Sequence, residues 1–403
     1  MEEISNAKKK ILIFTPYYHP EPFPINLFVE ELSNRNEIDN VTVVTCIPNY
    51  RNYKFYKGYN FFGPYRERLK KINVIRLPII PRLSNSKKSI FLFYSSFCIV
   101  SSIYLFFFSL FNRNKYSHLL TFCGSPVYVG YIGYVASKIL NSQSSLWIQD
   151  IWPEAIETTV GLKNKHLRSL ILKLQNAMWN FCDIVFSESQ ALSKYLKEIN
   201  LQKKIVTLYN PIRTEVSEKN INNLKKSGKN IFSYIGNIGG AQNIDLLVDS
   251  FNSANLKNSV LHICGDGSLL KILSSKYKNK NIVWHGWIEG KELEKIYQSS
   301  DFFILSLNSV GRQSLILPSK LQSYFMNKKP TLCISSGASK KLIEDIHAGI
   351  TCTEISKKAI IEMLKKAENL DNKEHSLMSQ NAFNYYKSHF TKVKIVDTFL
   401  KSI

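Results

Sequence analysis

Both halves of this chain begin with the same alternation of short apolar runs, turns and helical patterns. In the first half, the apolar runs Lys10–Thr15 and Val41–Thr45 enclose a proline-rich turn and a helical pattern. In the second half, Ile231–Ile235 and Val260–Cys264 enclose a glycine-rich turn and another helical pattern. Strands that alternate with helices are typical of parallel sheets covered by helices on both faces. The sequence therefore predicts an α/β protein with two Rossmann-like, doubly wound domains.

The length supports this division, because 403 residues exceed one ordinary core of about 150 residues. The segment Tyr209–Ile212, which is followed by the polar stretch Glu215–Asn230, indicates the boundary. We predict a first domain at 1–208, a second at 209–375 and a terminal helix at 376–403. The remaining strand candidates are short apolar runs: His118–Phe122, Ser145–Ile148, Ile184–Phe186, Ile205–Leu208, Phe302–Leu307 and Thr331–Ile334.

The chain is strongly basic, with a formal net charge of +22. A protein of this charge is expected to meet an anionic partner: a nucleic acid, a membrane surface or a phosphorylated substrate. The seven cysteines form no C-x-x-C pair, and the N-terminal segment has an acidic start and no long apolar run. These features favour a reducing, cytoplasmic location without a cleaved signal. No zinc-ligand spacing is present, so we assign no metal.

One segment, Ser89–Phe111, contains 23 residues without a charge. Its length alone is sufficient for a transmembrane helix. However, six serines interrupt it, and 13 Lys or Arg with a single acid, Glu67, lie between Arg51 and Lys115 among many aromatic residues. This combination favours a helix lying on an anionic membrane surface, with a buried core helix and a true span as alternatives. Binding of single-stranded nucleic acid is a further alternative, but no nucleic-acid motif accompanies the segment.

Two glycine-containing turns, Gly236–Gly240 and Gly265–Gly267, follow neighbouring apolar runs of the second half. Glycine lets the backbone approach an anion, and the N-terminus of the next helix directs N–H groups towards it. Two such turns on adjacent strands indicate a nucleotide site at the carboxyl edge of the sheet. Pro318–Lys320 opens a later helix, where we expect Ser319 to cap the helix and Lys320 to contact a diphosphate. The alternative for each turn is an ordinary loop, and for the later segment a capped surface helix.

The first half offers polar residues just after its predicted strands. Asp150 and Glu154 follow the run that ends at Ile148, and Trp147 and Trp152 flank Asp150, which suggests that both tryptophans line a cleft. His19 follows the first strand, although a lone histidine in a loop is more often simply solvated.

These residues resemble a known family over nearly the whole chain. The stretches ILIFTPYYHPEP, PNYRNYKFYKGY, WIQDIWPEAI, YIGNIGGAQNIDLLVDSF, ICGDGS, WHGWI and LPSKLQSYFMNKKP occur in the order and spacing of retaining glycosyltransferases of family 4. Within that family the resemblance is to the bacterial surface-polysaccharide branch that includes N-acetyl-L-fucosamine transferases of O-antigen and capsule assembly. It implies the GT-B fold, with two facing Rossmann-like domains and a C-terminal helix that crosses back to the first domain.

The resemblance also implies roles for individual residues. The catalytic candidates are Asp150, Lys320 and Glu154. The acceptor-side candidates are His19, Pro20 and Asn26. The nucleotide-sugar candidates gather around the two glycine turns and the later helix: Gly236, Asn237, Gly239, Gly240, Gln242, Gly265, Asp266, Gly267, Ile288, Arg312, Leu315, Pro318, Ser319 and Ser323.

This chain departs from the family pattern at four charged positions. The phosphate-binding Arg and Lys of the family fall on Asn237 and Gln242, the donor-sugar glutamate falls near Leu315, and the ribose-binding glutamate falls on Ser323. The resemblance then implies that the ribose contact passes to Ser319 or Gln322. Lys320, together with Arg312, is the remaining cation near the diphosphate.

The function implied by the resemblance is transfer of a sugar from a UDP-sugar to a polyprenyl-diphosphate-linked saccharide with retention of configuration. The implied sugar is an N-acetylated 6-deoxy amino sugar, and no cofactor other than the UDP-sugar donor substrate is expected. The expected location is the cytoplasmic face of the cell membrane, held there by peripheral or monotopic contact with anionic lipid. A nucleotide-sugar epimerase of the same fold and a non-enzymatic basic membrane-bound scaffold are the alternatives.

Overall fold

The computed structural model describes residues 8–49, 53–84, 86–126, 128–160, 164–199, 201–213, 228–308 and 311–403. The chain divides into two compact units. Unit 1 contains residues up to Pro211 together with Lys392–Ile403, and unit 2 contains Ile212–Thr391. Of the segment 376–403, only the part from Lys392 onwards belongs to unit 1. Most of the polar stretch after the predicted boundary lies outside the described residues.

Unit 1 is built on an eight-stranded sheet in the order β3-β4-β2-β1-β5-β6-β7-β8. All neighbouring strands run parallel except β3, which pairs antiparallel with β4 at the edge. The strands are β1 Lys9–Phe14, β2 Ile38–Cys46, β3 Arg66–Leu69, β4 Ile72–Leu77, β5 His118–Cys123, β6 Gln143–Ile148, β7 Ile184–Ser187 and β8 Lys204–Thr207. The helices are α1 Pro24–Ser33, α2 Lys87–Phe111, α3 Val129–Leu140, α4 Glu154–Val160, α5 Lys165–Phe181, α6 Gln190–Glu198 and α14 Lys392–Leu400.

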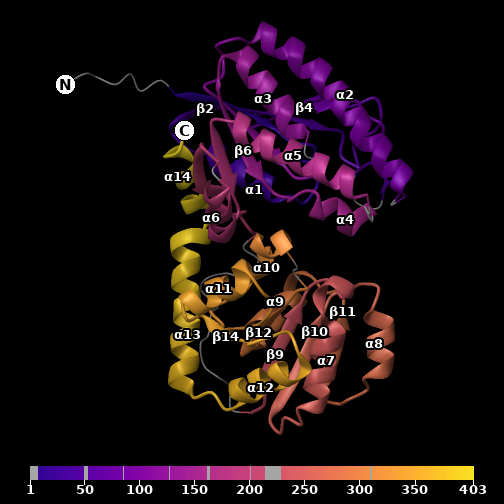
Figure 1. Cartoon of the computed structure of the whole chain (residues 1–403), viewed down its shortest axis with the longest axis vertical. Coiled ribbons are helices and arrows are strands. Elements are labelled where there is room, and N and C mark those ends of the chain that lie inside the picture. The colour runs from indigo at the N-terminus through magenta and orange to yellow at the C-terminus, as the bar shows by residue number, and fades with distance from the viewer. Residues whose placement is uncertain are drawn as a thin grey trace, which may run out of the picture. The chain divides into compact units, whose positions relative to one another are not determined.

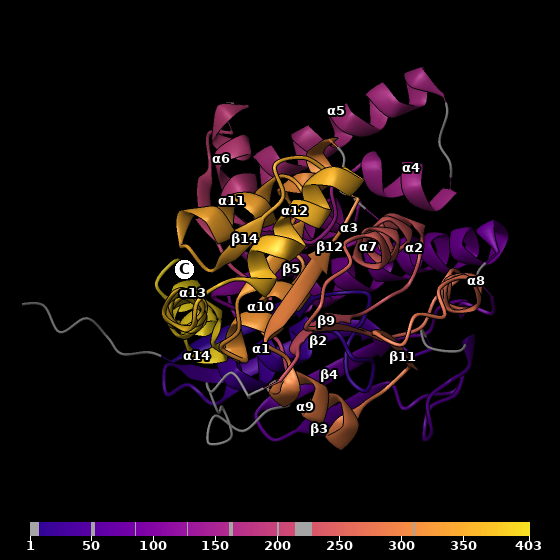
Figure 2. The ribbon, with the colours of Figure 1, turned by 90° about the horizontal axis from the view of Figure 1, so that it is seen from below.

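Aromatic side chains attach helices to both faces of this sheet. Phe399 of α14 packs against Phe28 of α1 and Phe186 of β7, which fixes the returning C-terminal segment in the unit 1 core. On the other face, α2 lies alongside α3 (Figures 1 and 2) and its Phe97 stacks on Phe14 of β1. Helices on both faces of a parallel sheet confirm the predicted fold class for this unit.

Unit 2 has a six-stranded, wholly parallel sheet in the order β11-β10-β9-β12-β13-β14. Its strands are β9 Asn230–Ile235, β10 Ser259–Cys264, β11 Ile282–Gly286, β12 Phe302–Ser306, β13 Thr331–Ile334 and β14 Gly349–Thr351. Its helices are α7 Ile244–Ser253, α8 Leu270–Lys276, α9 Gly290–Ser299, α10 Ser319–Met326, α11 Ala338–Asp345, α12 Lys357–Glu368 and α13 Asn372–Tyr385, with short helical segments η3 Gly240–Gln242, η4 Gly311–Leu315 and η5 Tyr386–Phe390.

The strand order of unit 2 reverses between β9 and β12, as in a doubly wound nucleotide-binding sheet. Helices α7 and α12 pack together on one face (Figure 2) and share an apolar core with β9 and β10. Ile296 of α9 joins a smaller apolar cluster with Cys264 at the end of β10. Ligands of such sheets bind outside the carboxyl ends of the strands at the point of reversal, which directs attention to the loops after β9, β10 and β12.

Candidate functional site

The turn after β9 and the turn after β10 lie against each other at the carboxyl edge of unit 2. Gly236 N donates to Cys264 O at 2.8 Å, and Ile238 N donates to Asp266 O at 2.8 Å. Gly265 has a φ of +137°, and a Cβ there would overlap the carbonyl of Gly236. Only glycine permits this backbone approach, so the two turns predicted from sequence form one structure.

Lys320 of α10 reaches this pair of turns. Its ammonium donates to the hydroxyl of Tyr234 at 2.9 Å and lies 4.6 Å from the centre of that ring. The Tyr234 hydroxyl in turn donates to Asn237 O at 2.6 Å, and a Cβ on Gly236 would overlap the Lys320 side chain. Burial lowers the pKa of Lys320 to about 8. The Lys320 ammonium is therefore partly desolvated beside the turn. An anion bound there would raise its pKa again, because it would stabilise the charged form.

Two amide side chains cover the middle of the turn. Asn237 Nδ2 donates to Gln242 Oε1 at 3.0 Å, and the pair folds over Gly239. The side-chain oxygen of Gln242 accepts this bond, so the amide N–H groups of Gln242 remain as neutral donors. Gly240 is exposed and opens the short segment η3. Neutral amide side chains thus stand at Asn237 and Gln242, where the resemblance implied an Arg and a Lys.

Helix α10 begins at Ser319, one residue earlier than the capping prediction requires. Pro318 is the N-cap, and Ser319 is the first helical residue and exposed, so the prediction that Ser319 caps the helix is wrong. Ser323 lies three residues after Lys320 and therefore shares its face of the helix, whereas Gln322 is buried. Of the residues suggested for the ribose, Ser323 and Ser319 are accessible and Gln322 is not.

The other nucleotide-sugar candidates of unit 2 have more varied surroundings. Asp266 is exposed and its Oδ1 accepts from Gly267 N at 2.7 Å, which holds the second turn. Ile288 is buried in the small apolar cluster at the end of β10, so it supports the strand end by packing. Arg312 and Leu315 are half-buried in η4.

In unit 1, Asp150 lies just beyond the end of β6 in a hydrogen-bonded chain. Trp152 Nε1 donates to Ser125 Oγ at 3.1 Å, and Ser125 Oγ donates to Asp150 Oδ2 at 2.8 Å. Burial raises the pKa of Asp150, and the bond from Ser125 opposes this. The interpretation of Trp147 as a cleft residue is wrong: its ring is buried in the core and its Nε1 donates to Leu208 O at 3.0 Å.

A second carboxyl group at this edge was not found from the sequence. Glu188 follows β7, is buried, and its Oε2 accepts from Asn210 Nδ2 at 2.8 Å, whereas no described residue bonds its Oε1. Burial, reinforced by the charge of Asp150, raises the pKa of Glu188 well above its usual value. Asn210 also donates to Gln149 Oε1 at 2.7 Å. The available signal was the Ser-Glu-Ser sequence directly after an apolar strand.

The acceptor-side candidates lie on the loop after β1 and the start of α1. His19 is exposed, and its carbonyl oxygen accepts from the buried Arg76 at 2.6 Å. Pro20 follows it in the same loop, and Asn26 Nδ2 donates to Glu21 O at 2.6 Å. These bonds hold the loop in place at the carboxyl end of β1.

Glu154 is directed to a different partner. It lies in the first turn of α4 and forms an ion pair of 3.5 Å with Arg168. Arg168 also bonds Glu157 at 2.6 Å, so Glu154 belongs to an ion-pair network joining α4 to α5.

Comparisons with known proteins agree with this geometry. Residues 216–385 match the family described as "Glycosyl transferases group 1". An uncharacterized 41.2 kDa protein in the cps region of Klebsiella pneumoniae is 21% identical over 285 residues, which are 69% of each chain. Sucrose-phosphate synthase from Thermosynechococcus elongatus has a similar fold, with a TM-score of 0.69, 13% identity and 98% of both chains covered.

A second similar structure contains a nucleotide. Anabaena Alr3699/HepE in complex with UDP has a TM-score of 0.64 and 13% identity, covering 98% of this chain and 99% of that one. At such identities these structures establish the fold. Most of unit 2 is thus similar to the glycosyl transferases group 1 family, and the chain has the GT-B fold.

Proposed function

We propose that this protein is a retaining glycosyltransferase of surface polysaccharide assembly. It transfers a sugar from a UDP-sugar to a saccharide linked to polyprenyl diphosphate. The observation that carries the proposal is the position of the Lys320 ammonium, held against two stacked glycine turns at the reversal point of the unit 2 sheet. This arrangement lies in the segment that matches the family.

The chemistry that this site supports is stabilisation of a leaving diphosphate. Negative charge develops on the diphosphate as the bond to the sugar breaks, and preformed donors aimed at that charge lower the barrier. Lys320 supplies the cation, and Gln242 and the backbone of the turns supply neutral donors. The UDP bound to the similar Anabaena structure supports a uridine nucleotide as the leaving group.

The acceptor is assigned to unit 1. Asp150 has the raised pKa and partial burial of a carboxylate that assists a hydroxyl group, and Glu188 lies within electrostatic reach of it. The cps-region relative supports a polysaccharide acceptor. The apolar outer face of α2, described below, supports contact with the cytoplasmic face of a membrane, where a lipid-linked acceptor is found.

The donor sugar is proposed from Leu315. This residue stands near the position of the family's sugar-binding glutamate, so a fully hydroxylated hexose would lose a hydrogen-bond acceptor there. An apolar side chain suits a methyl group, which favours a 6-deoxy, N-acetylated amino sugar. Competition between UDP-N-acetylglucosamine and its 6-deoxy analogues tests this choice, and preference for the 6-hydroxylated donor would contradict it.

The activity itself is tested with the full chain, a set of nucleoside diphosphate sugars and a lipid-linked acceptor. UDP-sugars are expected to raise the melting temperature, because ligand binding stabilises the native state by mass action. Transfer is expected to give a product whose anomeric proton coupling matches that of the donor. Isomerised nucleotide sugar without transfer would instead establish an epimerase, and failure to bind any nucleotide would establish a scaffold.

A further inference from the structure

Helix α2 has two apolar faces, only one of which is covered by unit 1. The covered face follows the spacing i, i+4 and consists of Phe93, Phe97, Ser101, Leu105 and Ser109. Large side chains on the rest of the helix are exposed: Phe91, Leu92, Ile99, Ile103, Phe106, Phe107, Leu110 and Phe111. The helix is long and apolar enough to cross a membrane, with a mean hydropathy of 2.0. It nevertheless connects β4 to β5 of one sheet and packs on α3, so it is a crossover helix of unit 1.

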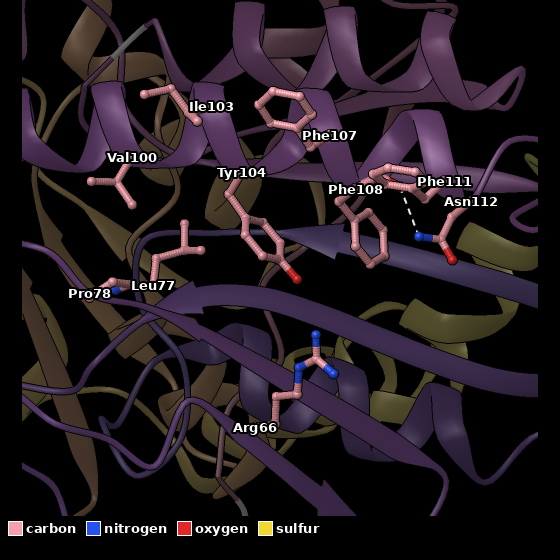
Figure 3. Close-up of a pocket in the computed structure, with 10 residues that line it drawn as sticks. All are labelled: Arg66, Leu77, Pro78, Val100, Ile103, Tyr104, Phe107, Phe108, Phe111 and Asn112. Atoms are coloured by element: carbon pink, nitrogen blue, oxygen red, sulfur yellow. Dashed lines mark hydrogen bonds between the residues drawn. The ribbon is translucent and has the colours of Figure 1, made fainter.

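A groove of about 590 Å³ runs between the outer face of α2 and the edge of the sheet (Figure 3). One wall is formed by α2 side chains, including Val100, Ile103 and Phe107. The other is formed by Leu77, the last residue of β4, and by Pro78. Its size is within the roughly 300–1,000 Å³ typical of small-molecule sites. The walls are apolar along most of their length, so the groove suits a hydrocarbon chain.

The groove ends at a cation. Arg66 of the edge strand β3 lines it, and the hydroxyl of Tyr104 points towards the Arg66 guanidinium in Figure 3. Arg66 also lines an adjoining polar basin of about 510 Å³, together with Arg68. In the described part of the chain, no ion pair involves Arg66 or Arg68. The apolar groove therefore opens into a basin that carries two arginines without an ion-pair partner among the described residues.

The single acid of the region, Glu67, also lines this basin, but its carboxylate is engaged by other side chains. Glu67 accepts from Tyr59 at 2.8 Å and pairs with the buried Arg76. Lys115 adds a further cation beyond the C-terminal end of α2, where its ammonium donates to Phe111 O at 3.3 Å. Apolar walls that lead to unpaired cations match a molecule with a long hydrocarbon chain and an anionic head.

We propose that this groove binds one membrane phospholipid, with an acyl chain against α2 and the phosphate at Arg66. The proposal rests on the membrane contact proposed above and is independent of glycosyl transfer. A bound phospholipid would fix how the exposed face of α2 lies on the bilayer, which a general attraction to anionic lipid does not do.

The test uses the full chain on vesicles that contain phosphatidylglycerol with a photoactivatable group on its acyl chain, without nucleotide sugar. Irradiation is expected to label Leu77, Ile103 and Phe107, identified by mass spectrometry. Val100→Trp fills the groove and should reduce this labelling by about tenfold, since an occupied groove excludes the chain. The matched control is Ile99→Trp, which adds the same side chain at an exposed neighbour that does not line the groove and should leave labelling unchanged.

A second variant tests the head group. Arg66→Gln should retain labelling but reduce the preference for phosphatidylglycerol over phosphatidylcholine, because the charge-assisted contact is lost. Equal labelling in the two tryptophan variants, or labelling spread evenly over Phe91 and Ile99, would overturn the proposal in favour of non-specific membrane contact. Cross-linked dimers without lipid adducts would overturn it in favour of a second copy of the chain. Loss of transferase activity with labelling intact would concern only the proposed reaction.

Discussion

Lys320 combines a position at the glycine turns with a pKa lowered by burial to about 8. Below that pH the free protein already carries the proton needed to bind a diphosphate. Above it, binding requires uptake of a proton, so the affinity for UDP should fall as pH rises from 8 to 9.5, by up to about tenfold per pH unit. Isothermal titration calorimetry between pH 7 and 9.5 measures this, and a pH-independent affinity would contradict a role for the ammonium.

Lys320→Met separates binding from folding. The variant should lose at least about tenfold in UDP affinity at pH 7.5, which is about 1.4 kcal/mol. Its melting temperature should not fall, because the folded state disfavours the charged form and Tyr234 retains its bond to Asn237 O. A large loss of thermal stability together with unchanged UDP affinity would make Lys320 a structural residue.

The contribution of Glu188 to stability depends on pH in the opposite direction to that of Lys320. Its pKa is raised in the folded state, so its contribution to stability falls as pH rises above the ordinary value for a glutamate. Glu188→Gln cannot titrate and keeps the size of the side chain, so its amide oxygen can still accept the bond from Asn210. The variant should melt on the order of 2 °C higher than wild type at pH 8, with a smaller difference at pH 5. A difference independent of pH would show that Glu188 has the same charge in both states.

The two residues also show what sequence reasoning could reach at this scale. Lys320 was predicted because it stands at the start of a helix in a motif with a physical role. Glu188 was missed because its partner Asn210 and the neighbouring Asp150 come from other strand ends, which no local pattern brings together.

At the scale of the element, the covered face of α2 depends on small residues. Ser101 is fully buried in the i, i+4 stripe, whereas the adjacent Ser102 is exposed. Ser101→Leu should destabilise unit 1 by about 1–3 kcal/mol through overpacking, and Ser102→Leu should have little effect. Chemical denaturation of both variants measures the difference, and equal stability would mean that α2 does not pack as described.

The sheet edge beside α2 shows which strands could not be predicted from the sequence. Strands with uniform apolar runs were predicted correctly, but β3, β4, β11 and β14 were not predicted. Of these, β3 is a charged edge strand whose sequence is Arg-Glu-Arg-Leu. Its pairing with β4 is set by a tertiary partner. The groove beside α2 depends on this edge and was therefore beyond prediction, although its apolar and basic components were both visible in the sequence.

At the scale of the whole molecule, the net charge of +22 gives the protein a long-range attraction to anionic surfaces. The full chain should sediment with vesicles containing phosphatidylglycerol and dissociate as salt rises, because screening shortens from about 10 Å at 0.1 M to about 3 Å at 1 M. Sedimentation over a salt series measures this, with phosphatidylcholine vesicles as the control. Binding that is indifferent to lipid charge would exclude the electrostatic contribution.

The return of the chain to unit 1 has a consequence for its synthesis. Phe399 is fully buried against Phe28 and Phe186, and the ammonium of Lys204 donates to Ser402 O at 2.7 Å. The ribosome makes the first part of unit 1 up to Pro211 and must then make Ile212–Thr391 before Lys392–Ile403 emerges. At roughly 5–20 residues per second, these intervening residues take on the order of 10–40 s. During that time the nascent unit 1 exposes the apolar surface that α14 later covers, and chaperones have a defined interval in which to bind it.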